Sequence, residues 1–294
     1  RRRHTRYISV TGVQTCALPI LGAAAGLSTT ASWTAESNQT SATFGYSVAG
    51  AGDVNGDGHS DVVVGAYSYD NGQSDEGRAY LFLGSASGLS TTASWTAESN
   101  QATAWLGWSV ASAGDVNGDG YSDVVVGAYL YDNGESDEGR AYLYLGAASG
   151  LATTASWTAE SNQNYTYFGN SVASAGDVNG DGYSDVVVGA YLYSNGEGNE
   201  GRAYLYLGAA SGLSTTASWT AESNQATAYF GSSVASAGDV NGDGYSDVVV
   251  GSHTYDNGQT DEGRAFLYLG SAASLTTTAA WTGESNQANA RFEI

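Results

Sequence analysis

Acidic side chains recur at a fixed spacing in four short loops of this chain. The second loop reads DVNGDGYSD, and its positions 1, 3, 5 and 9 are Asp115, Asn117, Asp119 and Asp123. Alternating side chains point inward along a tightly curved loop, and the two glycines of the motif permit that curvature. Three carboxylates and one amide oxygen gathered in this way would bind a hard divalent cation.

Calcium is the cation that this pattern favours. Ca²⁺ takes about six to eight oxygen ligands, whereas Mg²⁺ prefers fewer protein ligands and keeps bound water. Tyr121 at position 7 can offer its backbone carbonyl, and Asp123 can close the site in bidentate fashion. The repeating acidic and amide positions hold no cysteine or histidine, which argues against zinc. The first three ligand spacings match an EF-hand, but its twelfth-position glutamate is absent.

The fourfold recurrence separates a metal loop from a simple acidic turn. Asp-Gly and Asn-Gly pairs are common turn formers, so a single copy would fit either interpretation. All four copies keep D-x-N-x-D-G-x-x-D, and a turn does not require a carboxylate at position 9. We therefore predict one Ca²⁺ in each loop, four in total. The predicted ligands are Asp53, Asn55, Asp57, His59 and Asp61; Asp115, Asn117, Asp119, Tyr121 and Asp123; Asp177, Asn179, Asp181, Tyr183 and Asp185; and Asp239, Asn241, Asp243, Tyr245 and Asp247.

The acidic loops belong to a repeat with a period of 62 residues, which is also the spacing of a recurring tryptophan. A fixed period of this size indicates a stacked or radial repeat architecture. Within the second repeat, four strand-like runs separated by turn signals cover 107–114, 122–129, 139–146 and 154–161. The "VVV" run suits a strand buried on both faces, and "AYLYL" partly alternates as a half-buried strand does.

Four short antiparallel strands per repeat form the blade of a β-propeller. The predicted fold is therefore all-β, with four complete blades in repeat units at about 44–105, 106–167, 168–229 and 230–291. The tryptophan is expected to pack between blades. An orphan outer strand at 31–37 precedes the first unit, and the chain stops where another inner strand should begin. We expect a fragment of a larger propeller, with closure as a small ring as the alternative.

The N-terminal 20 residues match nothing in the repeats, which occupy 21–294. We interpret residues 1–20 as a non-native or fused leader. The alternative is a secretory signal, but Thr11, Gly12, Gln14 and Thr15 interrupt its apolar stretch. The chain contains no methionine, so we expect a processed product or a piece of a longer polypeptide. Cys16 is its only cysteine, so no intramolecular disulfide is possible.

Together, the elements "FG…SVASAGDVNGDGYSDVVVGAY" resemble the FG-GAP repeat, found in the propeller of integrin alpha subunits and in many bacterial extracellular proteins. The resemblance covers about residues 31–292 and implies calcium in all four Asp/Asn/Asp/Asp sets. The proline of the family's Gly-Ala-Pro is missing from every copy; Tyr67, Tyr129, Tyr191 and His253 stand in its place. The residues that carry the resemblance include no counterpart of the inserted domain through which integrins hold ligands. The resemblance therefore does not imply integrin-type recognition.

Alternate loops of an up-down blade emerge on the same face, and the repeats differ most on the face away from the acidic loops. Such variation on a rigid scaffold is typical of a binding surface. The candidate ligand-face residues are Trp105, Tyr129, Tyr131, Tyr165, Tyr167 and Tyr229. Their alternative role is to shield the tops of neighbouring blades. In the acidic "SDEGR" segment, Arg140 is expected to pair locally with Asp137 or Glu138.

Charge and composition exclude several classes of function. A net charge of −21 argues against nucleic acid as a partner, and no apolar stretch spans a bilayer. His4, His59 and His253 form no catalytic set with a nucleophile, so we do not expect an enzyme. We predict an extracellular or cell-surface calcium-binding module for adhesion or recognition, with a glycan or protein ligand. The alternative is a non-catalytic scaffold or spacer of a larger secreted or surface enzyme that degrades polysaccharide or lipid.

Overall fold

The computed structural model describes residues 22–23, 26–27 and 30–292 of the 294-residue chain. The leader predicted at 1–20 lies outside the described residues. Two short antiparallel strands come first, β1 (Gly22–Ala23) and β2 (Gly26–Leu27). No helix occurs among the described residues, and so none there is long and apolar enough to cross a membrane.

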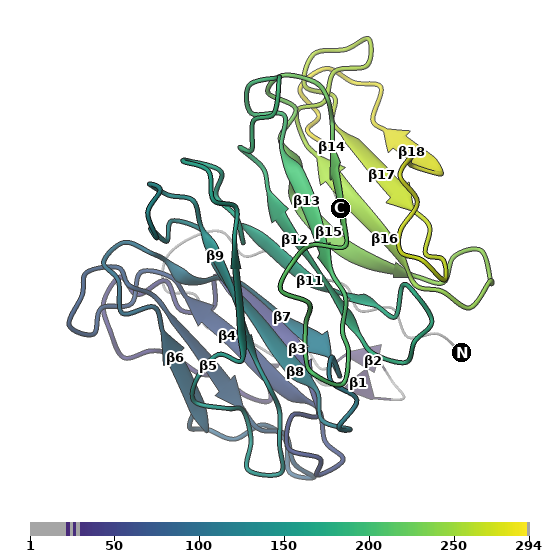
Figure 1. Cartoon of the computed structure of the whole chain (residues 1–294). Coiled ribbons are helices and arrows are strands. Elements are labelled where there is room, and N and C mark those ends of the chain that lie inside the picture. Colours follow the sequence, from purple (N-terminus) through teal and green to yellow (C-terminus); the bar gives the residue numbers. More distant parts are fainter. Residues whose placement is uncertain (1–21, 24–25, 28–29, 293–294) are drawn as a thin grey trace.

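Four four-stranded antiparallel sheets follow, one in each predicted repeat unit (Figure 1). Blade 1 contains β3 (Ser47–Gly52), β4 (Asp61–Ala66), β5 (Arg78–Phe82) and β6 (Trp95–Glu98). Blade 2 contains β7 (Leu106–Gly114), β8 (Asp123–Ala128), β9 (Arg140–Tyr144) and β10 (Trp157–Glu160). Blade 3 contains β11 (Ser171–Gly176), β12 (Asp185–Ala190), β13 (Arg202–Tyr206) and β14 (Trp219–Glu222). Blade 4 contains β15 (Phe230–Gly238), β16 (Asp247–Ser252), β17 (Arg264–Tyr268) and β18 (Trp281–Glu284).

Each sheet is a simple meander in which successive strands pair antiparallel, so the prediction of β-propeller blades is confirmed. The strands β8 and β12 are buried along their whole length, as predicted for a valine run covered on both faces. The inner strand of each blade ends in a register shift, as between Ser112 and Gly114. The glycine that follows the shift has a positive φ, 76° at Gly114, where the chain turns into the acidic loop.

The apolar cores lie between blades. In the first of them, Val54 and Trp95 of blade 1 pack with Val110, Tyr144 and Leu151 of blade 2. The Trp95 ring meets Tyr144 edge to face at 4.8 Å, and its Nε1–H donates to the Ala152 carbonyl of the next blade. The same arrangement recurs one and two periods later. The predicted inter-blade role of the tryptophan is therefore what the structure shows.

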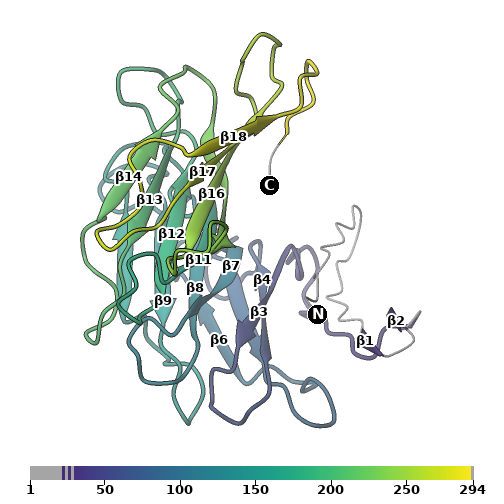
Figure 2. The ribbon, with the colours of Figure 1, turned by 90° about the vertical axis from the view of Figure 1, so that its right-hand side faces the viewer.

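The row of blades is open at both ends. Figures 1 and 2 show blade 1 and blade 4 at opposite ends of the row, with blades 2 and 3 between them. Val48 of blade 1 is 40% exposed, whereas its equivalents in the other blades are at most 9% exposed. Val240 of blade 4 is 52% exposed, although Val54, Val116 and Val178 are completely buried. The described residues therefore form a propeller segment, and closure as a small ring does not occur among them.

The local pairing expected for Arg140 is wrong. Arg140 forms its ion pair with Glu160, which lies directly opposite it in the neighbouring strand β10. Its guanidinium also lies 4.1 Å from the centre of the Tyr131 ring. Glu138 is completely buried instead, and its Oε1 accepts the Asn133 N–H at 2.7 Å. Sequence neighbours suggested the wrong partner because cross-strand pairing brings more distant residues face to face.

Two glycines offer a matched test of the blade interface. A side chain at Gly56 would begin 2.7 Å from the Tyr121 ring of blade 2, whereas one at Gly242 would meet nothing within 4 Å among the described residues. Both have positive φ, 73° and 78°, so alanine strains either backbone by about 1–2 kcal/mol. We expect Gly56→Ala to cost about 1–3 kcal/mol more than Gly242→Ala in urea unfolding, because only Gly56 is overpacked. Equal costs would contradict the interface.

Candidate calcium loops and aromatic face

The first residue of each acidic loop organises the backbone around it. In the loop at 115–123, Asp115 Oδ1 accepts the N–H of Gly118 at 2.7 Å and of Asp119 at 3.1 Å. Asp115 Oδ2 accepts the Gly120 N–H at 2.8 Å. Asp53, Asp177 and Asp239 accept the equivalent three N–H groups in their own loops. The four loops therefore share one conformation, although their environments differ.

The ninth residue has a structural task that the sequence analysis missed. Asp123 is completely buried at the start of β8. Its Oδ2 accepts the Val116 N–H at 2.8 Å, and its Oδ1 accepts the Gly146 N–H at 2.9 Å. The carboxylate thus ties the acidic loop to the connection between β9 and β10. The invariance of aspartate at position 9 was the available signal, but it was assigned to metal ligation alone.

Negative charge accumulates in these loops, and no arginine of the described blades lies at the same end of the sheets. Burial raises the pKa of Asp123 to about 6, against the lowering effect of its two backbone hydrogen bonds, and the carboxylates of Asp119 and Asp115 raise it further. Asp185 is affected in the same way, with a pKa of about 7. The blade arginines lie at the opposite end of the sheets, at the starts of β5, β9, β13 and β17. A divalent cation would supply the missing positive charge.

The donor chemistry of each loop fits calcium, but the described side chains are paired with one another. Asn117 Nδ2 donates to Asp119 Oδ2 at 2.9 Å, and Asp119 Oδ1 accepts the Tyr121 N–H at 3.0 Å. Among the described residues, no three acidic, histidine or cysteine side chains converge closely enough to hold a metal ion. Ligation would therefore require Asn117 and Asp119 to exchange their mutual hydrogen bond for the ion. The carboxylates at positions 1, 5 and 9 are already close enough to affect one another's charge.

The acidic loops of successive blades are in contact. The Tyr121 ring covers Gly56 of the preceding loop, and the Ser122 N–H donates to the Asp53 carbonyl at 2.9 Å. The Ala147 N–H donates to the Val54 carbonyl at 3.0 Å. Both hydrogen bonds recur between blades 2 and 3 and between blades 3 and 4. A residue predicted to ligate through its carbonyl therefore also packs the blades together with its ring.

A continuous row of aromatic rings runs across all four blades at the end of the sheets away from the acidic loops. Consecutive ring centres lie 4.4–5.8 Å apart. We call this row the aromatic arc; it consists of Tyr46, Tyr67, Trp105, Trp108, Tyr129, Tyr167, Tyr191, Tyr229 and His253. Burial raises the pKa of Tyr46 and Tyr191 to about 12, so these phenols stay neutral.

The structure brings together four of the six residues predicted for the ligand face. Trp105, Tyr129, Tyr167 and Tyr229 belong to the aromatic arc. Tyr131 does not join it, because its ring lies beneath Arg140 and packs against the core between blades 1 and 2. Tyr165 is 56% exposed on the same loop as Tyr167.

Five members of the aromatic arc were missed. Of these, Tyr67, Tyr191 and His253 carried a signal, because they occupy the position of the absent family proline. Tyr46 and Trp108 carried none, because they lie at the third position of the FG element, where the other repeats have Asn170 and Ser232.

Three bulky members of the arc have an unusual backbone conformation. Trp105, Tyr167 and Tyr229 have φ values of 58°, 59° and 57°, in the left-handed region that favours glycine and asparagine. Such a conformation costs on the order of 1–3 kcal/mol and persists only where the surroundings enforce it. The position in each case immediately precedes the Phe-Gly or Leu-Gly pair that begins the next repeat. Large aromatic side chains are therefore retained here despite an unfavourable backbone.

Comparison with known proteins agrees with this geometry. A family model described as the FG-GAP repeat matches residues 44–82, 106–144, 168–206 and 230–268, which together make up more than half of the chain. The chain is 30% identical to integrin alpha-5 of Xenopus laevis over 243 residues, covering 79% of this chain and 22% of the integrin. It is 32% identical to integrin alpha-V of Gallus gallus over 249 residues, covering 80% and 22%.

A shorter match is closer in sequence. The chain is 37% identical to integrin alpha-IIb of Mus musculus over 160 residues, covering 52% of this chain and 15% of the integrin. The chain spans about a fifth of the length of the integrin alpha-5 and alpha-V relatives. Four matched repeats, one on each four-stranded sheet, show that the chain belongs to the FG-GAP repeat family.

Proposed function

We propose that this chain is a calcium-stabilised recognition module, extracellular or at the cell surface, that binds a glycan or protein ligand on the face carrying the aromatic arc. The proposal assigns one Ca²⁺ to each acidic loop and places ligand contacts on the opposite face. Similarity to integrin alpha chains supports an extracellular location and a non-enzymatic role. The chain then acts as a rigid scaffold whose two faces have separate tasks.

The aromatic arc is the observation that carries the recognition proposal. Aromatic side chains offer large, rigid contact area with a polar edge, which suits both sugar rings and protein side chains. Trp105, Tyr167 and Tyr229 keep aromatic rings at positions where the backbone favours glycine. Because strained backbone clusters at ligand sites, it supports a binding role for these three residues.

A glycan array tests the proposal with the folded, calcium-loaded chain. We expect binding to at least one class of polysaccharide or oligosaccharide, and at least a tenfold loss of affinity in Trp105→Ala and Tyr167→Ala. Tyr131→Phe is the matched control, because this tyrosine lies on the same face but outside the arc. Its affinity should stay within about twofold of the unaltered chain.

The rival role of the arc is to shield the blades. Its rings pack against one another across blade boundaries, as Tyr129 and Tyr167 do at 5.3 Å, and this observation favours a scaffold or spacer. An array of extracellular proteins should accompany the glycan array, because the proposed ligand is a glycan or a protein. Absence of binding on both arrays, with melting curves that show folded protein, would contradict recognition and favour the spacer. Turnover of a polysaccharide would contradict the non-enzymatic assignment.

A further inference from the structure

Asparagine is followed by glycine at two places in every repeat, and the two places differ in structure. One pair lies in the acidic loop, as at Asn117-Gly118, and the other lies between the second and third strands of the blade, as at Asn133-Gly134. The dipeptide is the same at both places, so a difference in reactivity would come from the fold. We call the second set the distal pairs; they are Asn71-Gly72, Asn133-Gly134, Asn195-Gly196 and Asn257-Gly258.

An Asn-Gly pair carries the groups for its own covalent modification. The glycine nitrogen attacks Cγ of the asparagine, a C–N bond forms, and the Cγ–Nδ2 bond breaks to release ammonia. Water then opens the five-membered imide at either carbonyl and leaves aspartate or isoaspartate. The attack requires that the glycine N–H lose its proton and that the nitrogen approach Cγ to about 3–3.5 Å. Glycine favours the approach because it has no Cβ in the way.

In the acidic loops, both reacting groups are engaged. The Gly118 N–H donates to Asp115 Oδ1 at 2.7 Å, so loss of its proton would place negative charge against a carboxylate. The Asn117 side chain is held at both atoms, because its Oδ1 accepts the Asp119 N–H at 3.2 Å and its Nδ2 donates to Asp119 Oδ2 at 2.9 Å. The Tyr183 ring of the next blade covers Gly118. The hydrogen bonds of Gly118 and Asn117 recur in the other three acidic loops.

The distal pairs lack these restraints. Asn133 and Gly134 are exposed, and a side chain at Gly134 would meet nothing within 4 Å among the described residues. In the described part of the chain, the Gly134 N–H and Asn133 Oδ1 take part in no hydrogen bond. Of the asparagine amide, only Nδ2 is held, by Glu160 Oε2 at 2.9 Å, and this bond leaves Cγ open to attack. The other three distal pairs are exposed as well, and their Nδ2 atoms donate to the equivalent glutamates.

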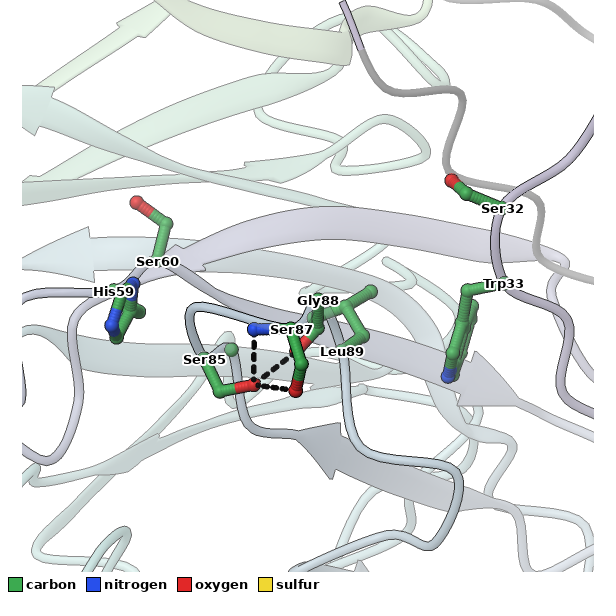
Figure 3. A pocket seen from close by; sticks show the side chains of 9 residues that line it. Ser32, Trp33, His59, Ser60, Ser85, Ser87, Gly88 and Leu89 are labelled. Carbon is green, nitrogen blue, oxygen red and sulfur yellow. Dashed lines mark hydrogen bonds between the residues drawn. The ribbon is translucent and has the colours of Figure 1, made fainter. Parts of the chain in front are cut away.

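A glycine with a positive φ does not by itself leave its N–H free. The turn at 85–88, which lines a pocket on blade 1, shows this (Figure 3). Its Ser85 Oγ accepts the Ser87 N–H at 3.3 Å and donates to the Gly88 carbonyl at 2.7 Å. The Gly88 N–H donates to the Ser85 carbonyl at 2.9 Å, although the φ of Gly88 is 106°, close to the 101° of Gly134. The free N–H of Gly134 is therefore a property of its own loop.

We propose that the four distal asparagines are modification sites of the folded chain, converted by deamidation to aspartate and isoaspartate, whereas the four acidic-loop asparagines are protected. The reaction consumes only water and releases ammonia. It depends neither on bound calcium nor on the proposed ligand.

The modification acts on a loop that supports the aromatic arc. A carboxylate at position 133 would face Glu160, which accepts from Asn133 Nδ2 in the unmodified chain and also pairs with Arg140. Because the two carboxylates would repel each other, the loop loses one of its anchors. The same loop holds an arc residue, since the Tyr167 N–H donates to the Asp137 carbonyl at 3.3 Å. Deamidation should therefore loosen the backbone at Tyr167.

Peptide mapping by mass spectrometry tests the proposal on the full chain. The chain is kept at mildly alkaline pH, in calcium and in EGTA, at a temperature where circular dichroism shows it folded, and is then cleaved at its arginines. The peptides 79–140, 141–202 and 203–264 each contain one acidic-loop pair and one distal pair, so each carries its own reference. We expect the distal asparagine of each peptide to gain about 1 Da at least about tenfold faster than the acidic-loop asparagine.

The chain unfolded in urea is the control, because both kinds of site then keep the Asn-Gly dipeptide without the surrounding structure. Their rates should agree there within about threefold. Equal rates in the folded chain, faster reaction in the acidic loops, or unreacted distal pairs after the time in which the unfolded chain reacts would each overturn the proposal.

Two variants separate the cause of protection from the effect of the modification. Asp115→Ala removes the acceptor of the Gly118 N–H, so Asn117 should react at least about fivefold faster in EGTA while Asn133 keeps its rate. Asn133→Asp reproduces one product, and the Tyr167 N–H should then exchange with solvent deuterium at least about threefold faster. An unchanged rate at Asn117 in a folded variant would contradict protection by this hydrogen bond. Unchanged exchange at Tyr167 would contradict the loosening.

Discussion

Removal of calcium with EGTA is expected to lower the melting temperature of this chain by about 12–24 °C. Extracellular calcium modules bind with dissociation constants of roughly 10⁻⁴–10⁻³ M. At about 1 mM free Ca²⁺ and the tight end of this range, each site adds about 1.4 kcal/mol to the free energy of unfolding. Four independent sites add about 6 kcal/mol, and each kcal/mol shifts the melting temperature by about 2–4 °C for a domain of this size.

The thermal unfolding should be followed by circular dichroism at constant ionic strength. The same concentration of Mg²⁺ is the control, and we expect it to restore little of the lost stability, because Mg²⁺ keeps its water. Equal melting temperatures in calcium and EGTA would contradict the assignment of the acidic loops to metal.

Substitution of a single buried carboxylate should destabilise the fold even without calcium. Asp185 is completely buried, and its two oxygens accept the N–H groups of Val178 and Gly208, each at 2.8 Å. Asp185→Ala would leave both donors buried and unpaired, so we expect it to lower the free energy of unfolding by about 2–5 kcal/mol in EGTA. Urea unfolding measured in EGTA and in calcium tests this expectation.

Asp181 of the same loop is the matched control. It is exposed, and its carboxylate accepts only the Tyr183 N–H at 3.0 Å and a hydrogen bond from Asn179 Nδ2 at 2.8 Å. Asp181→Ala should therefore cost under about 1 kcal/mol in EGTA and about 1.4 kcal/mol more in calcium, where one site is lost. Similar costs for both variants in EGTA would contradict the structural role of position 9.

Local patterns were sufficient to predict the strands and their order. The valine run at 124–126 and the glycines around it placed β8 to within a residue at each end. The 62-residue period predicted the blades because self-similarity at this length needs no knowledge of contacts. The period also predicted the inter-blade tryptophan, since one large apolar residue per repeat has few other places to pack.

Contacts between strands and between blades could not be predicted from local sequence patterns. Arg140 was assigned to its neighbours in the chain, whereas its partner Glu160 is 20 residues away and is set by the register of β9 and β10. Glu138 looked like a surface acid, because nothing in "SDEGR" shows that the loop folds over it. The aromatic arc was found only in part, because its members come from three positions of the repeat and meet only when the blades are stacked.

The two ends of each blade thus have different physical requirements. At one end, buried aspartates and backbone N–H groups hold the acidic loops in the same conformation in all four repeats. At the other end, the residue before the Phe-Gly or Leu-Gly pair of each repeat varies among Thr43, Trp105, Tyr167 and Tyr229, although its left-handed backbone conformation does not. We therefore expect stability to depend on the acidic end and specificity on the aromatic end.

The number of calcium ions bound per chain decides whether each acidic loop is a metal site. The chain, stripped of metal and dialysed to equilibrium against about 10 mM Ca²⁺, which exceeds the expected dissociation constants at least about tenfold, should hold close to four calcium ions per chain by elemental analysis, corrected for the dialysate. Asp115→Ala should reduce the number to three while the chain stays folded. Four bound ions, falling to three in the variant, are the result expected for one Ca²⁺ in each acidic loop. A chain that is folded under these conditions and holds no calcium would contradict it.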